Sequence, residues 1–221
     1  MSARTEGRTV AGLRFSGTEI RDLLVAWLAL GVAFAVFFEG GGIAAVTGLL
    51  SPTGALLFVV SLLTAGVAFL FHEVAHKAVA VRYGQVAEFR ADRGMLFLAV
   101  MSAMIGFIFA APGAVHHRGR LTPEEHGHIA LAGPAVNLAL GVVFLPAFAA
   151  GLAVSSPLLA LVGARGVAIN LFLAAFNLIP YGPLDGKTVL GWSKPVWAVS
   201  FAVSAAATVG FLMAGGAAYA L

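Results

Sequence analysis

Long apolar runs separated by short polar segments make up most of this 221-residue chain. A helix that crosses a bilayer needs about 20 predominantly apolar residues, and several of the runs reach that length. The pattern therefore predicts a protein built from membrane-spanning helices. Asp, Glu, Lys and Arg are missing from five stretches: residues 40–72, 94–117, 126–164, 166–184 and 195–221.

Breaks in the backbone divide these runs into individual helices. The run from Leu23 to Phe38 predicts a retained first span, because no small-residue cleavage pattern of a signal peptide follows it. One straight helix over residues 126–164 would reach roughly 58 Å, nearly twice the thickness of a bilayer core. We therefore expect a break at Ser155-Ser156-Pro157, since a residue before proline is disfavoured in a helix. The expected spans are about residues 23–38, 55–83, 128–152, 158–180 and 195–221.

Composition excludes several classes of protein. The chain is 60% hydrophobic and 10% charged, whereas soluble domains are about 45–50% apolar and about 25% charged. A soluble enzyme, a nucleic-acid-binding module and a disordered chain are therefore excluded. The net charge is only +3, and the basic residues lie next to the apolar runs, as signals for cytoplasmic segments do. We expect residues 1–22 to form a basic cytoplasmic segment and residues 23–221 a single polytopic domain in the cell membrane.

A candidate metal-binding motif lies inside the second apolar run. It reads His72-Glu73-Val74-Ala75-His76, and the chain has no cysteine that could ligate a metal instead. Histidines at positions i and i+4 lie one turn apart on the same face of a helix, so both can bind one ion. Glu73 lies beside them, where it can act as general base on a water molecule. Ionisable groups are costly inside a span and persist where they have a role.

A third ligand has to come from elsewhere, because a catalytic zinc takes three protein ligands and keeps one open position. Asp185 is the only acidic residue after Glu125, and helix-breaking residues flank it in Pro180-Tyr-Gly-Pro183-Leu-Asp185-Gly186. Its position favours a ligand role. A loop carboxylate or a helix cap is the alternative interpretation.

These motifs resemble those of the site-2 protease family of intramembrane zinc metalloproteases. The resemblance covers about residues 55–190 and includes Ala132-Gly133-Pro134-Ala-Val-Asn137, which is similar to the family's Gly-Pro-x-x-Asn element, and the Asn177…Pro180…Asp185-Gly186 segment. It implies one Zn²⁺ per chain and membrane-anchored protein substrates within the lipid bilayer. No nucleic-acid partner is expected, and the sequence identifies no stable partner. The peptide-binding insert and the nucleotide-sensing domain of other members are missing from this sequence. The implied roles are zinc ligation by His72, His76 and Asp185, and general-base catalysis by Glu73.

Other polar residues have more than one interpretation. Asn137 and Asn177 correspond to the family's paired asparagines, and we expect them to bind the substrate backbone or the oxyanion. The alternative is that they join helices to one another, which is our interpretation of Asn170. Four histidines could form a second metal site, but we expect them to be solvated: His116, His117, His126 and His128.

The 17-residue segment Met95–Ala111 decides the topology. His72 and Asp185 have to lie at similar depth, and each follows an apolar run, so their two helices run in the same direction. An odd number of spans must then separate them. We therefore expect Met95–Ala111 to re-enter and leave on one side, bent near Gly106, and not to cross as a sixth span. Both a strand hairpin and a helix are compatible with this segment, and a strand could hold a substrate extended by edge pairing.

The sequence thus predicts an all-α membrane protein with about five transmembrane helices and a re-entrant segment. We expect an intramembrane zinc metalloprotease with its site toward the cytoplasmic side. A metal-binding membrane transporter and an inactive protease-like scaffold are the alternatives. Glu73 distinguishes the transporter, which needs metal ligands but no general base.

Overall fold

The computed structural model describes residues 7–109 and 112–220, so the expectations that concern residues 1–6, 110–111 and 221 lie outside the described residues. Helices dominate it, and four short strands form two small sheets. In chain order the elements are β1 (Gly7–Val10), β2 (Leu13–Ser16), α1 (Gly17–Phe38), α2 (Gly42–Gly48), α3 (Pro52–Ser61), the π-helical turn η1 (Leu62–Gly66), α4 (Val67–Arg82), β3 (Val86–Ala91), α5 (Arg93–Met104), β4 (Gly113–Arg118), α6 (Pro123–Ala153), α7 (Pro157–Asn177), α8 (Asp185–Trp192), α9 (Lys194–Phe211), the π-helical turn η2 (Leu212–Gly216) and α10 (Ala217–Ala220).

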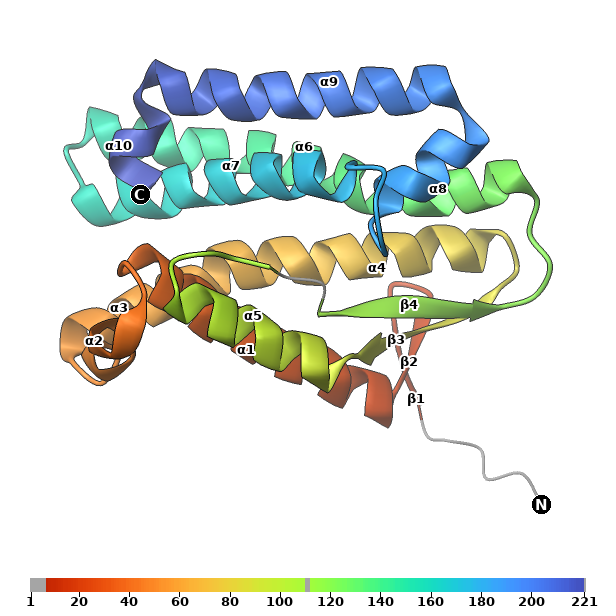
Figure 1. Cartoon of the computed structure of the whole chain (residues 1–221), viewed down its shortest axis with the longest axis horizontal. Coiled ribbons are helices and arrows are strands. Elements are labelled where there is room, and N and C mark those ends of the chain that lie inside the picture. Colours follow the sequence, from red (N-terminus) through yellow and green to blue (C-terminus); the bar gives the residue numbers. More distant parts are fainter. Residues whose placement is uncertain (1–6, 110–111, 221) are drawn as a thin grey trace.

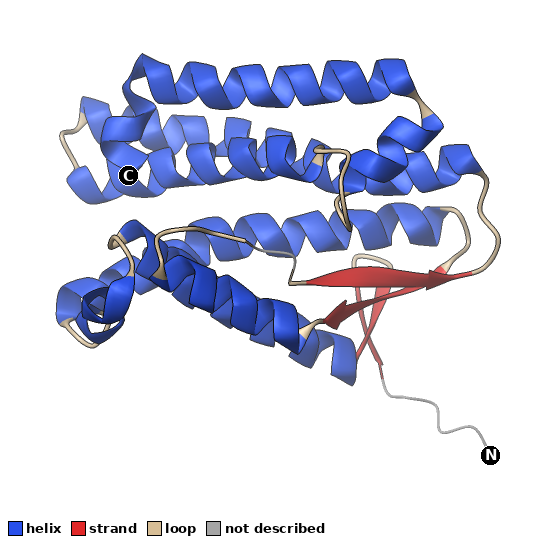
Figure 2. Ribbon diagram, viewed as in Figure 1, coloured by secondary structure: helices blue, strands red, loops and turns tan. Residues whose placement is uncertain are grey.

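The helices pack in layers around α4, which lies near the centre (Figure 1). On one side α4 packs against α6, and α7 packs between α6 and α9. On the other side lie α1 and α5, which pack against each other. Both sheets lie at one end of the bundle (Figure 2), the end where α4 finishes and α6 begins.

Five helical segments are long and apolar enough to cross a bilayer, which confirms the predicted membrane fold. The second of them runs unbroken through α3, η1 and α4. The expected break between the third and fourth spans is also confirmed, because α6 ends at Ala153 and α7 begins at Pro157. Ser155 has a φ of 52° there, and the side chain of Ser156 caps α7. The five segments are Gly17–Phe38, Pro52–Arg82, Pro123–Ala153, Pro157–Asn177 and Lys194–Ala220.

The segment expected to re-enter turns back on itself within its described residues, and of the two conformations left open for it, strand hairpin or helix, it adopts a helix. Its apolar residues form α5, whose 12 residues reach only about 18 Å, too short to cross. The chain reverses at Gly106, whose φ is 78°. It then returns to β4, which pairs with the preceding strand β3 in antiparallel register. Asp92 explains the helix, because its carboxylate caps the first turn by accepting from the backbone of Met95 at 3.0 Å.

The N-terminal hairpin was not predicted. Strands β1 and β2 pair antiparallel around a tight turn at Ala11 and Gly12, which have φ angles of 48° and 80°. Positive φ at both central residues is typical of a hairpin turn that matches strand twist. Ser16, the last residue of β2, caps α1, because its hydroxyl oxygen accepts from the backbone N–H of Glu19 at 3.1 Å. The hairpin thus ends where the first span begins.

The crossing of α6 can be tested by labelling, since the chain contains no cysteine. Arg120 precedes α6 and Val154 follows it, and both residues are exposed. The 31 residues of α6 reach about 46 Å, so the two positions should lie on opposite sides of the membrane. We expect a membrane-impermeant maleimide to label only one of Arg120→Cys and Val154→Cys in intact vesicles. Labelling of both variants before permeabilisation would contradict this topology.

Candidate metal centre

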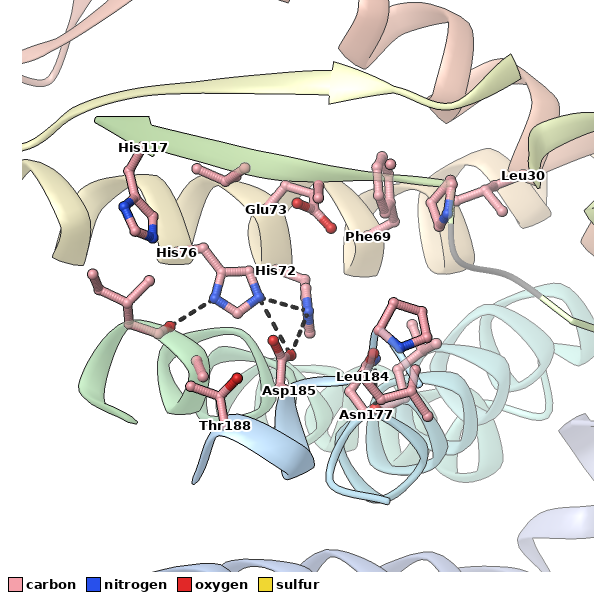
Figure 3. Close-up of a pocket in the computed structure, with 18 of the residues that line it drawn as sticks. Leu30, Phe69, His72, Glu73, His76, His117, Asn177, Leu184, Asp185 and Thr188 are labelled. Carbon is pink, nitrogen blue, oxygen red and sulfur yellow. Dashed lines mark hydrogen bonds and ion pairs between the residues drawn. The ribbon is translucent and has the colours of Figure 1, made fainter. Parts of the chain in front are cut away.

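Three ligand atoms meet between α4 and α8. His72 and His76 lie one turn apart on α4, and their Nε2 atoms are 2.9 Å apart. Asp185, the first residue of α8, places Oδ2 3.2 Å from Nε2 of His72 and 3.4 Å from Nε2 of His76 (Figure 3). The two motifs, more than 100 positions apart in the sequence, are thus brought together as the sequence predicts.

Hydrogen bonds on the far side of each ring determine which nitrogen carries the proton. Nδ1 of His72 donates to Oδ1 of Asn137 at 2.6 Å, and Nδ1 of His76 donates to the carbonyl of Ile129 at 2.7 Å. Each Nε2 is therefore an electron-pair donor. Oδ2 of Asp185 is buried and has no hydrogen-bond partner among the described residues. Two imidazole nitrogens and one carboxylate oxygen that face one another in this way form a ligand set for a metal cation.

The spacing of these atoms fits a small metal ion. Two ligands at about 2.0–2.2 Å from a tetrahedral ion lie about 3.4 Å apart. The distances here are 3.2 and 3.4 Å to Asp185 and a shorter 2.9 Å between the two imidazoles. The group of His72, His76 and Asp185 is the one cluster of three His, Cys, Asp or Glu ligands found among residues 7–109 and 112–220. Two imidazoles and one carboxylate leave one tetrahedral position free for a water molecule.

Gly133 lets α6 approach the metal-binding residues. A Cβ at this position would lie 2.5 Å from Nε2 of His72 and 2.5 Å from Nε2 of His76. Any side chain there would enter the space between the ligands. The glycine that begins the Gly-Pro-x-x-Asn element is therefore needed because a larger residue would collide with the two histidines.

Asn137, the last residue of that element, takes a position that differs from the expected one. It is fully buried, and its two N–H groups donate to the carbonyl of Ala68 at 3.1 Å and to Oδ1 of Asn170 at 3.0 Å. Because both donors are used inside the protein, Asn137 has none left for a substrate or an oxyanion. We therefore correct its assignment: Asn137 orients His72, and Asn170 orients Asn137.

A cleft opens beside the ligands and contains the proposed base. Glu73 lines it and lies on the side of α4 that faces β4 (Figure 3). None of the hydrogen bonds among the described residues involves the Glu73 carboxylate. Asn177, at the end of α7, also lines the cleft and donates one N–H to the carbonyl of Leu173 at 3.0 Å. Of the two expected asparagines, only Asn177 lies where it can reach a substrate.

Three of the four remaining histidines have partners within the protein. His117 of β4 and His126 of α6 line the cleft, with ring centroids 5.2 Å apart. His128 forms a hydrogen bond of 2.7 Å with the Tyr83 hydroxyl. Burial, together with His126 and His116, lowers the pKa of His117. Alternate residues of a strand face opposite sides, so a predicted strand would have indicated that His117 faces the cleft. However, β4 was not predicted from the sequence.

The relatives found by comparison with known proteins carry the name "Putative zinc metalloprotease". Over 191 residues the chain is 41% identical to the Methanocaldococcus jannaschii protein named "Putative zinc metalloprotease MJ0611". The match covers 84% of this chain and 90% of that protein. The chain belongs to the site-2 protease family. This identification agrees with the ligand geometry and makes the chain a metalloprotease.

Two longer relatives of this site-2 protease carry the same kind of name. It is 37% identical over 149 residues to Rip3 of Mycobacterium tuberculosis and 33% identical over 153 residues to sll0528 of Synechocystis. These matches cover 66% and 67% of this chain but only 32% and 35% of the relatives. No protein-family model and no solved structure matches the chain.

The role of Asn137 in this site-2 protease can be measured through metal affinity. Replacing the residue that orients a metal-binding histidine typically weakens binding about 10- to 100-fold. We expect Asn137→Leu to lower the affinity for Zn²⁺ by that factor in a competition assay with a chelator. Asn137→Asp keeps an acceptor for Nδ1 of His72 but loses the donors to Ala68 and Asn170, so its affinity for Zn²⁺ should fall less than that of Asn137→Leu. Equal losses in both variants would argue against the orienting role.

Proposed function

We propose that this protein uses one zinc ion to hydrolyse peptide bonds in or near the transmembrane segments of membrane-anchored proteins. One observation carries the proposal: the three-ligand group and Glu73 lie in a cleft inside a bundle with five membrane-spanning segments. A substrate that reaches this cleft comes from the membrane or its surface. The names of the relatives support the metalloprotease part of the proposal.

The ligand set favours zinc. Two imidazoles and one carboxylate with an open position are typical of catalytic zinc sites, and His72, His76 and Asp185 supply that set. A bound zinc ion lowers the pKa of a water molecule to about 7 and polarises the carbonyl of the bond to be cut.

Glu73 is the proposed carrier of the proton. Its carboxylate takes a proton from the attacking water and passes it to the nitrogen of the leaving amine, as a general base and then a general acid. Its position in the cleft, next to the ligands on the same helix, suits both steps. The second N–H of Asn177 has no partner among residues 7–109 and 112–220, so it can donate to the substrate backbone or to the developing oxyanion.

The cleft continues from the ligands into an apolar region. Leu30 and Phe34 of α1 and Leu173 of α7 line that region, which suits the apolar side chains of a transmembrane segment. A helix has no free carbonyl at its centre, because its backbone groups bond to one another. The substrate therefore has to unwind at the bond to be cut, and its backbone then needs new hydrogen-bond partners.

The outer edge of β4 offers such partners. In the antiparallel register, Asp92 donates to the carbonyl of Pro112 at 2.9 Å, so the pairs formed by even-numbered residues bond to each other. The backbone groups of Gly113, Val115 and His117 accordingly point away from β3, and these residues line the cleft. We therefore place strand addition, expected within residues 95–111, at β4 instead.

The site lies toward the cytoplasmic side in this proposal. Basic residues gather at the end of the bundle that holds the two sheets. In the segment after α1, residues 39–51, Glu39 is the only charged residue. Cytoplasmic segments near spans carry an excess of Lys and Arg. The basic residues at this end include Arg82, Arg90, Arg93, Arg120, Lys187 and Lys194.

Replacement of the base tests the chemistry. We expect detergent-purified wild-type protein to cleave single-span peptides and to stop when a chelator removes zinc. Glu73→Gln keeps the size of the side chain but cannot take the proton, so it should bind one zinc and leave the peptides uncut. Zinc content and peptide cleavage are measured on the same preparations.

The same variant separates the alternatives. A transporter would carry zinc across vesicles equally well in the wild type and in Glu73→Gln, and neither would cut peptides. An inactive scaffold would bind zinc and do neither. Cleavage that survives in Glu73→Gln would overturn the proposed role of this residue.

A proline on the outer edge of β4 tests strand addition. Val115→Pro removes one N–H that faces the cleft and leaves the bonds between β3 and β4 in place. We expect the KM for a single-span peptide to rise while zinc content stays at one per chain. Val115→Ala keeps the N–H and serves as the control. An unchanged KM in Val115→Pro would exclude strand addition at this edge.

A further inference from the structure

A buried ion pair lies directly behind the metal-binding residues. Lys77 follows His76 on α4, and its Nζ donates to both carboxylate oxygens of Glu19 on α1, at 2.6 and 2.5 Å. The two side chains are only 2% and 0% exposed. Neither residue lines the cleft that holds the ligands, so the proposed chemistry does not use them.

Lys77 also connects α4 to the N-terminal hairpin. Its Nζ donates to the carbonyl of Arg14 on β2 at 2.7 Å, and it lies over the ring of Phe15 at 4.1 Å from the ring centre. The ammonium group is therefore enclosed by α1, α4 and β2. Directional bonds on several sides hold it in one place.

Glu19 extends the connection to the sheet at the cleft. Its Oε1 accepts from the backbone N–H of Phe89 on β3 at 3.0 Å. Asp22, one turn further along α1, stands 3.4 Å from the backbone nitrogen of Ala91 and accepts from it. Both N–H groups belong to odd-numbered residues, which face away from β4. Two carboxylates of α1 thus occupy the outer edge of β3, while the outer edge of β4 faces the cleft.

We propose that Glu19 and Lys77 are a positioning pair that sets the distance between the metal-binding helix α4 and the substrate-binding edge of β4. The inference rests on the proposed function, in which that edge holds the substrate. The path is short: Lys77 is adjacent to His76, Glu19 bonds to both Lys77 and Phe89, and Phe89 lies opposite Val115 in the sheet.

Directional bonds do here what apolar packing does not. Phe69 of α4 and Phe89 of β3 contact each other edge to face, with ring centroids 5.6 Å apart, and such a contact tolerates sliding. The carboxylate of Glu19 instead joins an ammonium group and a backbone N–H at fixed distances. Stability alone does not account for the pair, because apolar residues often replace a buried ion pair without loss of stability.

The test removes both charges together, so that no unpaired charge is left in the interior. In Glu19→Gln/Lys77→Met the glutamine can still accept from Phe89, but the bond to α4 is lost. We expect Zn²⁺ affinity and melting temperature to stay near the wild-type values. The kcat/KM for a single-span peptide should fall by up to about 100-fold, the cost of displacing a substrate by about 1 Å. The half-buried ion pair on β3 gives the control, Glu88→Gln/Arg90→Met, which should leave kcat/KM unchanged.

A double-mutant cycle with Val115→Pro shows whether the pair acts through β4. If it does, adding Val115→Pro to Glu19→Gln/Lys77→Met should cause little further loss, because both changes remove the same interaction. Fully additive losses, an unchanged kcat/KM in the pair variant, or a loss of zinc along with activity would each overturn the positioning role. Failure of the proposed function has a different signature, since the wild-type protein would then leave the peptide uncut.

Discussion

The centre of this protein depends on three metal-ligand atoms that face one another. Nε2 of His72, Nε2 of His76 and Oδ2 of Asp185 lie within 3.4 Å of one another, and hydrogen bonds on the far side of both rings turn each Nε2 toward the gap. A bound cation would stabilise this arrangement. Much of the surrounding packing serves it, since Gly133 makes room for the ligands and Asn137 orients one of them.

The backbone that enters the bundle also needs partners for its polar groups. Polar backbone groups at membrane depth need partners and are tolerated where they line a cavity. The outer edge of β3 finds partners in the carboxylates of Glu19 and Asp22. The outer edge of β4 lines the cleft, where an unwound substrate could complete it. One small sheet thus has one edge bound to the protein and one edge left for a substrate.

The sequence predicted the features that depend on local spacing. It did not predict most contacts between residues that are distant in the chain. The i, i+4 histidines, the five apolar segments and the break at Ser155–Pro157 all depend on local periodicity, and the structure places them as expected. Asn137 was different. Its motif was visible, but the two acceptors that use up its N–H groups lie 69 and 33 positions away. The re-entry of residues 95–111 was deduced from the depth of the two metal motifs, whereas α5 and β4 were not.

By itself the sequence determined that the chain enters a membrane, which residues could ligate a metal, and which family it belongs to, because apolar run length and helical periodicity are local properties. Tertiary structure decided the rest. Only packing brings Asp185 to the imidazoles, turns Asn137 toward His72, faces His117 and His126 into the cleft and buries Lys77 against Glu19. Each of these contacts joins distant segments, and a contact between distant segments leaves no period in the chain.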